Sequence, residues 1–216
     1  MKTALRLCSF TTLVFVVLLV SPINATQDSD GFYSVRNGDY LGRIATHSGV
    51  SISEIRKANK ITGDVIHPGD SLRIPNPMHK ISGSKIVWSK PFKGSSGSIE
   101  RSFGTKSPTK WLKIPYSGTD INTPVGTNIF SPADGIIRYI GTQEGYGNVM
   151  IIEHGGKYAS VIGPLASKPN CVKINQIVLR GDKLGVTDNP IVGTTPYLHI
   201  ELRKNNKAIN PARLLR

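Results

Sequence analysis

The sequence has 216 residues, of which 38% are hydrophobic, so it can bury the core of one medium domain or of a small domain beside a medium one. Its 27 Lys and Arg residues exceed its 14 Asp and Glu residues, which gives a formal net charge of +13. This charge favours anionic polymers as partners, although a charged surface can also serve solubility alone. No nucleic-acid recognition motif accompanies the charge, so nucleic acid is excluded as a partner.

Residues 1–25 have the layout of a secretory signal. Lys2 and Arg6 come first, an apolar run extends from Leu7 to Val20, and small residues end at Ala25. We predict cleavage after Ala25, which makes this an exported protein of the periplasm or cell envelope with no transmembrane anchor. The apolar run is shorter than the ~20 residues of a membrane-spanning helix, and an uncleaved anchor is the alternative.

The chain has two cysteines. Cys8 lies at the start of the apolar run and not just after it, so it is badly placed to carry a lipid on the mature protein. Cleavage leaves Cys171 as the only cysteine, so we expect no disulfide within the chain. We predict that Cys171 is a buried, inert thiol, because free cysteine commonly behaves as a small core residue; pairing between two chains is the alternative.

Residues 33–75 predict a small domain with the order strand, helix, helix, strand. Asp39 is placed to cap the first helix, and Gly49 is placed to end it. The segment from Ser51 to Glu54 predicts a capping box at the start of the second helix. Each helix carries apolar residues at the spacing of one buried face, namely Leu41, Ile44 and Ala45 in the first and Ile52, Ile55 and Ala58 in the second.

The same segment, residues 33–75, resembles the LysM module over its whole length. The match rests on Tyr33, Val35, Gly38-Asp39-x-Leu41, Ile44-Ala45, Asn59 and Pro68-Gly69-Asp70-x-Leu72-x-Ile74-Pro75. The resemblance implies non-catalytic binding of the N-acetylglucosamine backbone of peptidoglycan or chitin between two turns. Tyr40 stands where the family usually has threonine, and it either stacks on a sugar or packs within the domain. The residues expected to bind peptidoglycan are Gly38, Asp39, Tyr40, Leu41, Asn59, Ile61, Val65 and Ile66.

Residues 76–84 contain proline, serine and glycine and predict a linker that tethers two domains without fusing them. From residue 85 the pattern changes to short β-prone runs between Gly and Pro residues. In the last run, Leu198, Ile200 and Leu202 alternate with His199 and Glu201, so one strand face is apolar and the other polar. The predicted fold class is therefore mainly β, with a small α+β domain followed by an all-β domain over residues 85–216. The runs that predict strands are 135–140, 149–153, 158–162, 176–179 and 198–202.

From about Val87 to the C-terminus, the chain resembles the LytM, or lysostaphin-type, zinc peptidase domain. In active members of that family, zinc is held by the His and Asp of one motif and by the second His of a His-x-His motif. The first His of that pair, and another on a preceding strand, assist proton transfer. The residues that carry the resemblance are Ser102-Phe-Gly104, Gly118-x-Asp120-Ile121, Pro124-x-Gly126-Thr127, Ala133-Asp134-Gly135, Gly145-Tyr-Gly147-Asn148, His154-Gly155, Gly181-Asp182, Leu198-His199-x-Glu201 and Asn210-Pro211.

Carried onto this chain, the resemblance implies an incomplete metal site. Tyr116 replaces the first ligand and Tyr197 the paired assisting histidine, whereas Asp120 and His199 are kept. Pro164 occupies the place of the other assisting histidine. A catalytic zinc needs three protein ligands and an open position, so we predict a degenerate domain with no catalytic residues and no bound metal. We expect Asp120 and His199 to pair with each other instead.

His154 is the other histidine of this second domain. It ends a predicted strand beside Gly155 and Gly156, which indicate a hairpin turn, so we expect His154 in the turn or at the surface and not as a metal ligand. An aromatic ring with a hydroxyl group suits protein contacts. We therefore predict a partner-binding groove formed by Tyr116, Asp120, Tyr197 and His199.

The combination of export signal, LysM module and degenerate LytM domain resembles the NlpD/EnvC class of murein hydrolase activators. This resemblance implies that the protein binds peptidoglycan without cutting it and activates an N-acetylmuramoyl-L-alanine amidase during cell separation and wall remodelling. No cofactor is expected. Two alternatives stay open. One is an active zinc metalloendopeptidase that cleaves peptidoglycan cross-links, and the other is a passive wall-binding scaffold.

Overall fold

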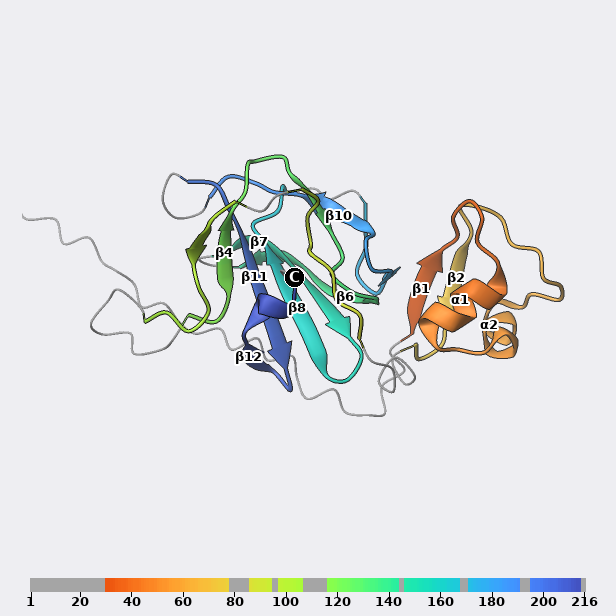
Figure 1. Ribbon diagram of the computed structural model, residues 1–216. Coiled ribbons are helices and arrows are strands. Elements are labelled where there is room, and N and C mark those ends of the chain that lie inside the picture. Colours follow the sequence, from red (N-terminus) through yellow and green to blue (C-terminus); the bar gives the residue numbers. More distant parts are fainter. Residues whose placement is uncertain are drawn as a thin grey trace, which may run out of the picture.

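The computed structural model describes residues 30–77, 86–94, 97–106, 116–143, 146–167, 171–190 and 195–214. They form an N-terminal domain, residues 30–77, and a C-terminal domain, residues 86–214 (Figure 1). The predicted signal, residues 1–25, and residues 78–84 of the predicted linker lie outside the described residues. Within the described part of the chain, no helix is long and apolar enough to cross a membrane.

The N-terminal domain has the predicted order of strand, helix, helix and strand. These elements are β1 (Gly31–Ser34), α1 (Leu41–Ser48), α2 (Ile52–Asn59) and β2 (Ser71–Ile74). The two strands pair in antiparallel register, with Tyr33 opposite Leu72. The apolar faces of both helices pack on this hairpin, and Ile44 and Ile55 are almost fully buried there.

Two of the three predicted helix boundaries are confirmed. Gly49 ends α1 in the left-handed conformation with φ of 67°, and Ser51 forms the complete capping box of α2 with Glu54. The predicted cap by Asp39 is wrong, because the residue before α1 is Tyr40 and its side chain makes no capping bond. The Asp39 carboxylate instead accepts hydrogen bonds from the Arg36 amide (2.8 Å) and from a tyrosine hydroxyl in β1. Asp39 therefore fastens the turn before the helix.

The C-terminal domain is built around one eight-stranded antiparallel sheet, as the sequence predicts for an all-β domain. A separate two-stranded antiparallel sheet is formed by β5 (Asn128–Phe130) and β10 (Lys183–Val186), and the turn of 3-10 helix η1 (Pro211–Leu214) follows the last strand. From one edge to the other, the main sheet runs β3 (Ile99–Arg101), β4 (Thr119–Asn122), β11 (Tyr197–Lys204), β8 (Tyr158–Gly163), β7 (Gly147–His154), β6 (Gly135–Gln143) and β9 (Ile177–Val178), with β12 (Lys207–Ile209) paired to β11.

Strand β11 shows how the core positions the polar residues. Leu198, Ile200 and Leu202 are fully buried in the main apolar cluster of the domain, which confirms the predicted apolar face. The alternate residues His199 and Glu201 are also buried, with 2% and 3% of their surface exposed. Both faces of this strand are therefore covered, and the polar face lies inside the protein and not against solvent.

Two predictions about single residues are wrong. His154 is fully buried at the end of β7, where its ring nitrogens lie 2.9 Å from Asp134 O and 2.9 Å from Ser160 Oγ. The hairpin turn that follows it is present, but the imidazole points inward from the strand and not into the turn. Cys171 is exposed as a free thiol, because it lies in a turn segment and not in a strand.

The prediction of two merely tethered domains is also wrong. Phe32 of β1 donates its backbone N–H to Asn175 O over 3.0 Å, and Arg36 forms an ion pair with Asp182 over 2.5 Å. The last two residues lie 146 positions apart in the sequence. A contact between such distant residues leaves no trace in local composition, which is the reason that the linker pattern could not reveal it.

Candidate functional site

The residues of the predicted site come from two neighbouring strands of the main sheet. Strands β4 and β11 pair in antiparallel register, which puts Asp120 directly opposite His199 and Tyr197 opposite Asn122. Tyr116 lies four residues before Asp120, at the entry to β4. Asp120 and His199 are buried, whereas Tyr116 and Tyr197 are partly exposed. The fold therefore brings Tyr116, Asp120 and His199 together near the start of β4, whereas Tyr197 lies at the other end of the β4–β11 pair.

Asp120 and His199 form a hydrogen-bonded pair, which confirms the prediction that these two residues pair with each other. His199 Nδ1 lies 2.7 Å from Asp120 Oδ1. The Tyr116 hydroxyl donates to the same Oδ1 atom over 2.6 Å and lies 2.9 Å from His199 Nδ1. The Tyr116 hydroxyl thus contacts both the Asp120 carboxylate and the His199 imidazole.

The opposite side of the His199 ring faces a second carboxylate. His199 Nε2 lies 3.4 Å from Glu201 Oε1, which also accepts a hydrogen bond from Ser117 Oγ over 2.5 Å. Arg203 donates to Glu201 Oε2 over 2.6 Å. The sequence reasoning did not assign Glu201 or Arg203 to the site. Their spacing of two and four residues from His199 on one strand is the signal that could have found them.

Aromatic rings enclose the imidazole. The rings of Tyr116 and Tyr146 meet the His199 ring edge to face, with centroids 5.5 Å and 5.1 Å away. The Arg101 guanidinium lies over the Tyr116 ring, 4.7 Å from its centroid. Gly118 fits only because it lacks a side chain, since a Cβ atom there would lie 2.4 Å from His199 Cε1. No local sequence pattern links Tyr146 to His199, so the sequence could not place it here.

Burial and charge set the protonation states in this cluster. Burial alone would lower the pKa of His199, but the hydrogen bonds and charges of Asp120 and Glu201 outweigh it and raise that pKa. Burial would raise the pKa of Glu201, yet His199, Ser117 and Arg203 together bring it down to about 2. The two carboxylates therefore favour the protonated form of the imidazole.

The Tyr116 phenol is held in its neutral form. Burial raises the pKa of Tyr116 first, and the charge and hydrogen bond of Asp120 raise it further. A neutral phenol is a weak zinc ligand, and Tyr116 uses its proton to bond Asp120.

Asp120, His199 and Glu201 do not together fit a three-ligand zinc site. Asp120 lies at one ring nitrogen and Glu201 at the other, so the two carboxylates cannot meet with the imidazole at one ion. Among the described residues, no group of three or more His, Cys, Asp and Glu side chains is arranged to hold a metal ion. The arrangement is that of a buried ion pair with a hydrogen-bonding tyrosine.

The two positions at which the resemblance implies assisting histidines flank the pair. Gly163 of β8 lies opposite His199 in the sheet, and Pro164 follows it in a buried position. Tyr197 is two residues before His199 on β11 and is partly exposed. Neither Pro164 nor a neutral tyrosine can take up a proton as an imidazole does.

The residues predicted to bind peptidoglycan fall into exposed and internal groups. Tyr40 and Val65 are exposed by 64% and 74%, and Leu41 is a core residue exposed by only 2%. Asn59 binds within the domain, because its Nδ2 donates to Ile55 O and Arg73 O while its Oδ1 accepts from Arg73 N. The others are Gly38, which is exposed, and Asp39, Ile61 and Ile66, which are partly buried.

Comparison with protein families identifies both domains. Residues 33–75 match the LysM domain, and residues 115–211 match peptidase family M23. The two matched families, in this order, are those that the sequence resemblance implies.

Relatives of known sequence include cell-wall enzymes. The chain is 28% identical to the uncharacterized lipoprotein YgeR of Escherichia coli over 249 residues, which cover 94% of this chain and 90% of YgeR. It is 33% identical over 98 residues to an uncharacterized metalloprotease of Haemophilus influenzae, covering 45% of this chain and 20% of that protein. It is also 32% identical over 96 residues to the peptidoglycan DD-endopeptidase ShyA of Vibrio cholerae, covering 44% of this chain and 22% of ShyA. The chain thus spans about a fifth of the length of the last two relatives.

The fold also has solved counterparts. A zinc containing peptidase from Vibrio cholerae matches with a TM-score of 0.53 and 18% sequence identity, covering 86% of this chain and 70% of that one. At this level of identity the likeness concerns the fold, and it agrees with the predicted mainly β class.

Proposed function

We propose that the protein is an exported, peptidoglycan-binding and non-catalytic member of the LytM group that activates a cell-wall N-acetylmuramoyl-L-alanine amidase. The observation that carries this proposal is the bonding of His199. Both of its ring nitrogens face carboxylates, and the Tyr116 hydroxyl stands beside the Asp120 end of the pair. This arrangement uses the groups that a zinc ion would need, and it supports a role in binding and not in hydrolysis.

In this proposal the N-terminal domain supplies attachment to the wall. Tyr40 offers a largely exposed ring, which lies against Gly42. Such a ring can cover the apolar face of a sugar while its hydroxyl bonds to water or glycan. Attachment at the wall raises the local concentration of the protein where the amidase acts.

The C-terminal domain supplies the contact with the amidase. Because Asp120 and His199 are buried, the partner meets the partly exposed tyrosines and not the ion pair itself. The buried pair fixes the Tyr116 ring through its hydroxyl, and the Arg101 guanidinium covers a face of that ring. Activation is then a population shift, in which this surface binds the open form of the amidase more tightly than the closed form.

Export to the cell envelope agrees with the comparisons. YgeR, which aligns with nearly the whole chain, is described as a lipoprotein, and ShyA acts on peptidoglycan. We therefore place the protein in the periplasm, at the wall.

An active zinc endopeptidase is the second candidate function. The similarity of the C-terminal domain to the endopeptidase ShyA favours it. This candidate requires metal-dependent release of wall fragments by the protein alone, which the activator proposal does not.

The experiment that tests the proposal measures release of dye from labelled peptidoglycan. Residues 26–216 are assayed alone and with each amidase of the same cell. We expect no release by the protein alone and a large stimulation of one amidase. Tyr197→Ala should abolish the stimulation, whereas the matched variant Tyr139→Ala, at a partly exposed tyrosine of β6, should keep it.

Two outcomes oppose the proposal. Release by the protein alone that a chelator stops would favour the endopeptidase. Wall binding with no stimulation of any amidase, unchanged by Tyr197→Ala, would favour a passive scaffold.

A further inference from the structure

The two domains share main-chain pairing at one edge of the main sheet. Phe32 of β1 forms a parallel bridge with Gln176, and its N–H donates to Asn175 O over 3.0 Å. Gln176 directly precedes β9, which is the last strand of the eight-stranded sheet. The first strand of the N-terminal domain is thereby attached to that edge.

A bidentate ion pair between the two domains lies beside this bridge. Arg36 donates from both terminal nitrogens to the two oxygens of Asp182, over 2.5 Å and 2.6 Å. Each partner also has a contact within its own domain. The Leu179 amide donates to Asp182 Oδ2 over 2.7 Å, and the Arg36 guanidinium lies over the Tyr33 ring, 5.6 Å from its centroid. A paired fork of this kind fixes direction as well as distance.

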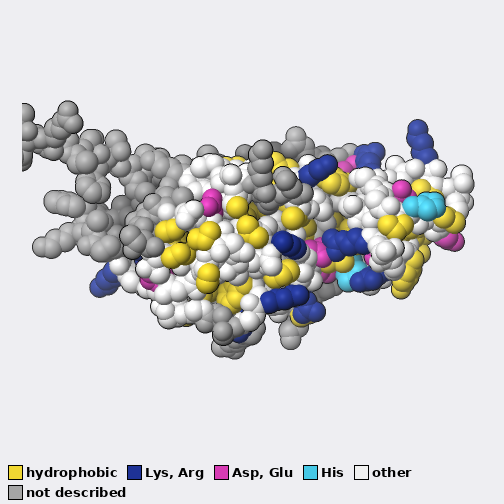
Figure 2. All heavy atoms as spheres, turned by 90° about the horizontal axis from the view of Figure 1, so that it is seen from above, with side chains coloured by type: hydrophobic (Ala, Val, Ile, Leu, Met, Phe, Trp, Pro, Cys, Tyr) yellow, Lys and Arg dark blue, Asp and Glu magenta, His cyan; other side chains and the backbone are white. Residues whose placement is uncertain are grey.

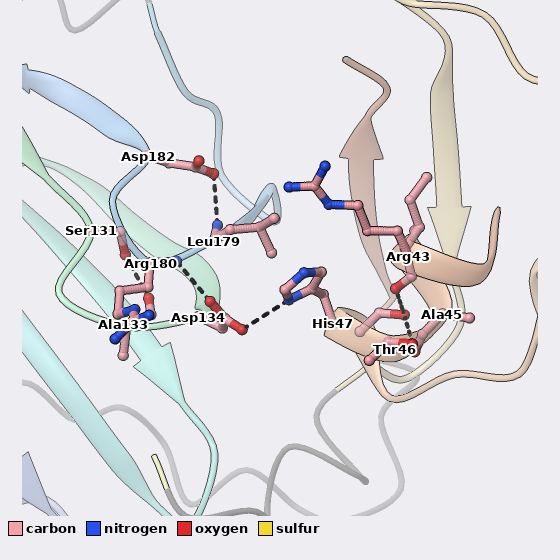
Figure 3. Close-up of polar contacts among 12 residues, drawn as sticks. Arg43, Ala45, Thr46, His47, Ser131, Ala133, Asp134, Leu179, Arg180 and Asp182 are labelled. Carbon is pink, nitrogen blue, oxygen red and sulfur yellow. Dashed lines mark hydrogen bonds and ion pairs between the residues drawn. The ribbon is translucent and has the colours of Figure 1, made fainter. Parts of the chain in front are cut away.

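A second polar contact lies on the other side of the junction. His47 of α1 places Nδ1 3.3 Å from Asp134 Oδ2, and the Arg180 amide donates to Asp134 Oδ1 over 2.7 Å (Figure 3). Figure 3 also shows the Arg43 side chain directed from α1 toward the C-terminal domain. Asp134 and Asp182 thus play the same part. Each carboxylate accepts a hydrogen bond from a backbone amide of the C-terminal domain, and each also contacts a side chain of the N-terminal domain, His47 or Arg36 respectively.

Between these polar contacts, the two domains share one apolar cluster. Ile136, Ile177 and Leu179 of the C-terminal domain pack in the same buried cluster as the core of the N-terminal domain, and they are exposed by 0%, 2% and 8%. Gly31 of β1 allows this approach, because a Cβ atom there would lie 3.0 Å from Ile177 Cγ1. The junction is therefore part of a continuous apolar core and not a polar contact between two separate domain surfaces.

The position of the junction leaves both candidate sites open. The N-terminal domain sits at the β9 edge, whereas Asp120 and His199 lie on β4 and β11 toward the other edge of the sheet (Figure 1). Tyr40 and Val65 stay exposed although the domains are packed together. In Figure 2, Lys and Arg side chains gather around the junction, with acidic side chains and a histidine between them.

We propose that the face of the C-terminal domain formed by Asp134, Asn175, Gln176, Ile177 and Asp182 is a docking surface for the N-terminal domain of the same chain. The two domains then move as one rigid body, with a fixed spacing between the exposed LysM surface and the Tyr116–His199 cluster. This inference rests on the junction alone and does not depend on the partner or activity of either site.

The test is the rotational diffusion of residues 26–216 in solution, measured by backbone amide relaxation. We expect the amides of both domains to report one common correlation time. Arg36→Glu, which sets two negative charges against each other, should separate the correlation times and shorten that of the N-terminal domain. Asp182→Asn should act in the same direction, because it keeps an acceptor for the Leu179 amide but removes the charge that binds Arg36.

The control is Lys57→Glu, which makes the same change of charge as Arg36→Glu but at an exposed residue of α2. Lys57 lies outside the junction, because the polar contacts of the junction come from β1, the turn after it and α1. It should leave the common correlation time unchanged. Chemical shifts inside each domain show that all three variants remain folded. Separate correlation times in the unmodified protein would overturn the proposal, and so would a common time that survives both Arg36→Glu and Asp182→Asn.

Discussion

His199 and Asp120 occupy directly opposite positions of β11 and β4, and His199 Nδ1 lies 2.7 Å from Asp120 Oδ1. Both residues are buried, with 2% and 4% of their surface exposed. They stand where the resemblance to zinc peptidases implies two metal ligands, and the carboxylates of Asp120 and Glu201 raise the pKa of the imidazole. The predictions about this cluster follow from the pairing of these two residues.

The buried pair should contribute to stability as a coupled unit. His199→Gln leaves Asp120 buried without its imidazole partner and Glu201 with Arg203 as its cation, and we expect a loss on the order of 3 kcal/mol in the free energy of unfolding. Urea unfolding of His199→Gln, Asp120→Asn and the double variant measures the coupling. Because the residues are in contact, the double variant should lose clearly less than the sum of the two single losses. Additive losses would mean that the pair does not interact in solution.

Restoring an imidazole at the first ligand position should restore metal binding. Tyr116→His puts a third strong donor beside Asp120 and His199, which is the number that a catalytic zinc requires. We expect the purified variant to retain close to one zinc per chain after dialysis against zinc-free buffer. Tyr116→Phe is the matched control and should retain none, since it removes the hydroxyl and adds no donor. If the histidine variant stays free of zinc, Asp120 and His199 are not positioned as former ligands.

His154 should make the protein sensitive to mild acid. Burial lowers the pKa of His154 to about 4, although the hydrogen bond to Asp134 opposes the shift. The unfolded chain takes up this proton near pH 6.5 and the folded chain only near pH 4, so stability falls as the pH drops through that window. From pH 7 to pH 5 the unmodified protein should lose about 2 kcal/mol more stability than His154→Gln. Equal losses in the two proteins would show that His154 takes up its proton at the same pH in the folded and the unfolded chain, so that its pKa is not lowered by burial.

Tyr40 should contribute to wall binding and not to folding. Its side chain is 64% exposed, so Tyr40→Ala should change the free energy of unfolding by less than about 0.5 kcal/mol. Loss of a ring that stacks on a sugar should weaken binding to purified peptidoglycan by about 2- to 10-fold. A sedimentation assay with insoluble peptidoglycan measures this, with Lys57→Ala as the control at an exposed residue of α2. Unchanged binding by Tyr40→Ala would assign the tyrosine to packing.

Much of the fold could be predicted because its signals are local. The capping box at Ser51 and the glycine after α1 are decided by residues within one turn, and both are present. The alternation along residues 198–202 correctly gave the apolar face of β11, because the side-chain period of a strand is two. All five β-prone runs contain a strand, namely β6, β7, β8, β9 and β11.

The failures share a cause, because each depends on partners that are distant in the sequence or on a choice between two local partners. Asp39 could bond to the helix end or to the turn before it, and the structure uses the turn. His154 looked like a turn residue, but Trp88, Asp134 and Ser160 enclose it. The Asp120–His199 pair could be predicted only because the resemblance placed both residues at one site, while Tyr146 and the junction of the domains had no such guide.

The central claim is that Asp120 and His199 pair with each other and do not hold zinc, and the most direct test is metal content. Residues 26–216 are purified, given equimolar zinc, dialysed and analysed by mass spectrometry for metal per chain. We predict far less than one zinc per chain and no change in unfolding on adding zinc. One tightly held zinc per chain, lost together with wall digestion when His199 or Asp120 is replaced, would contradict the claim.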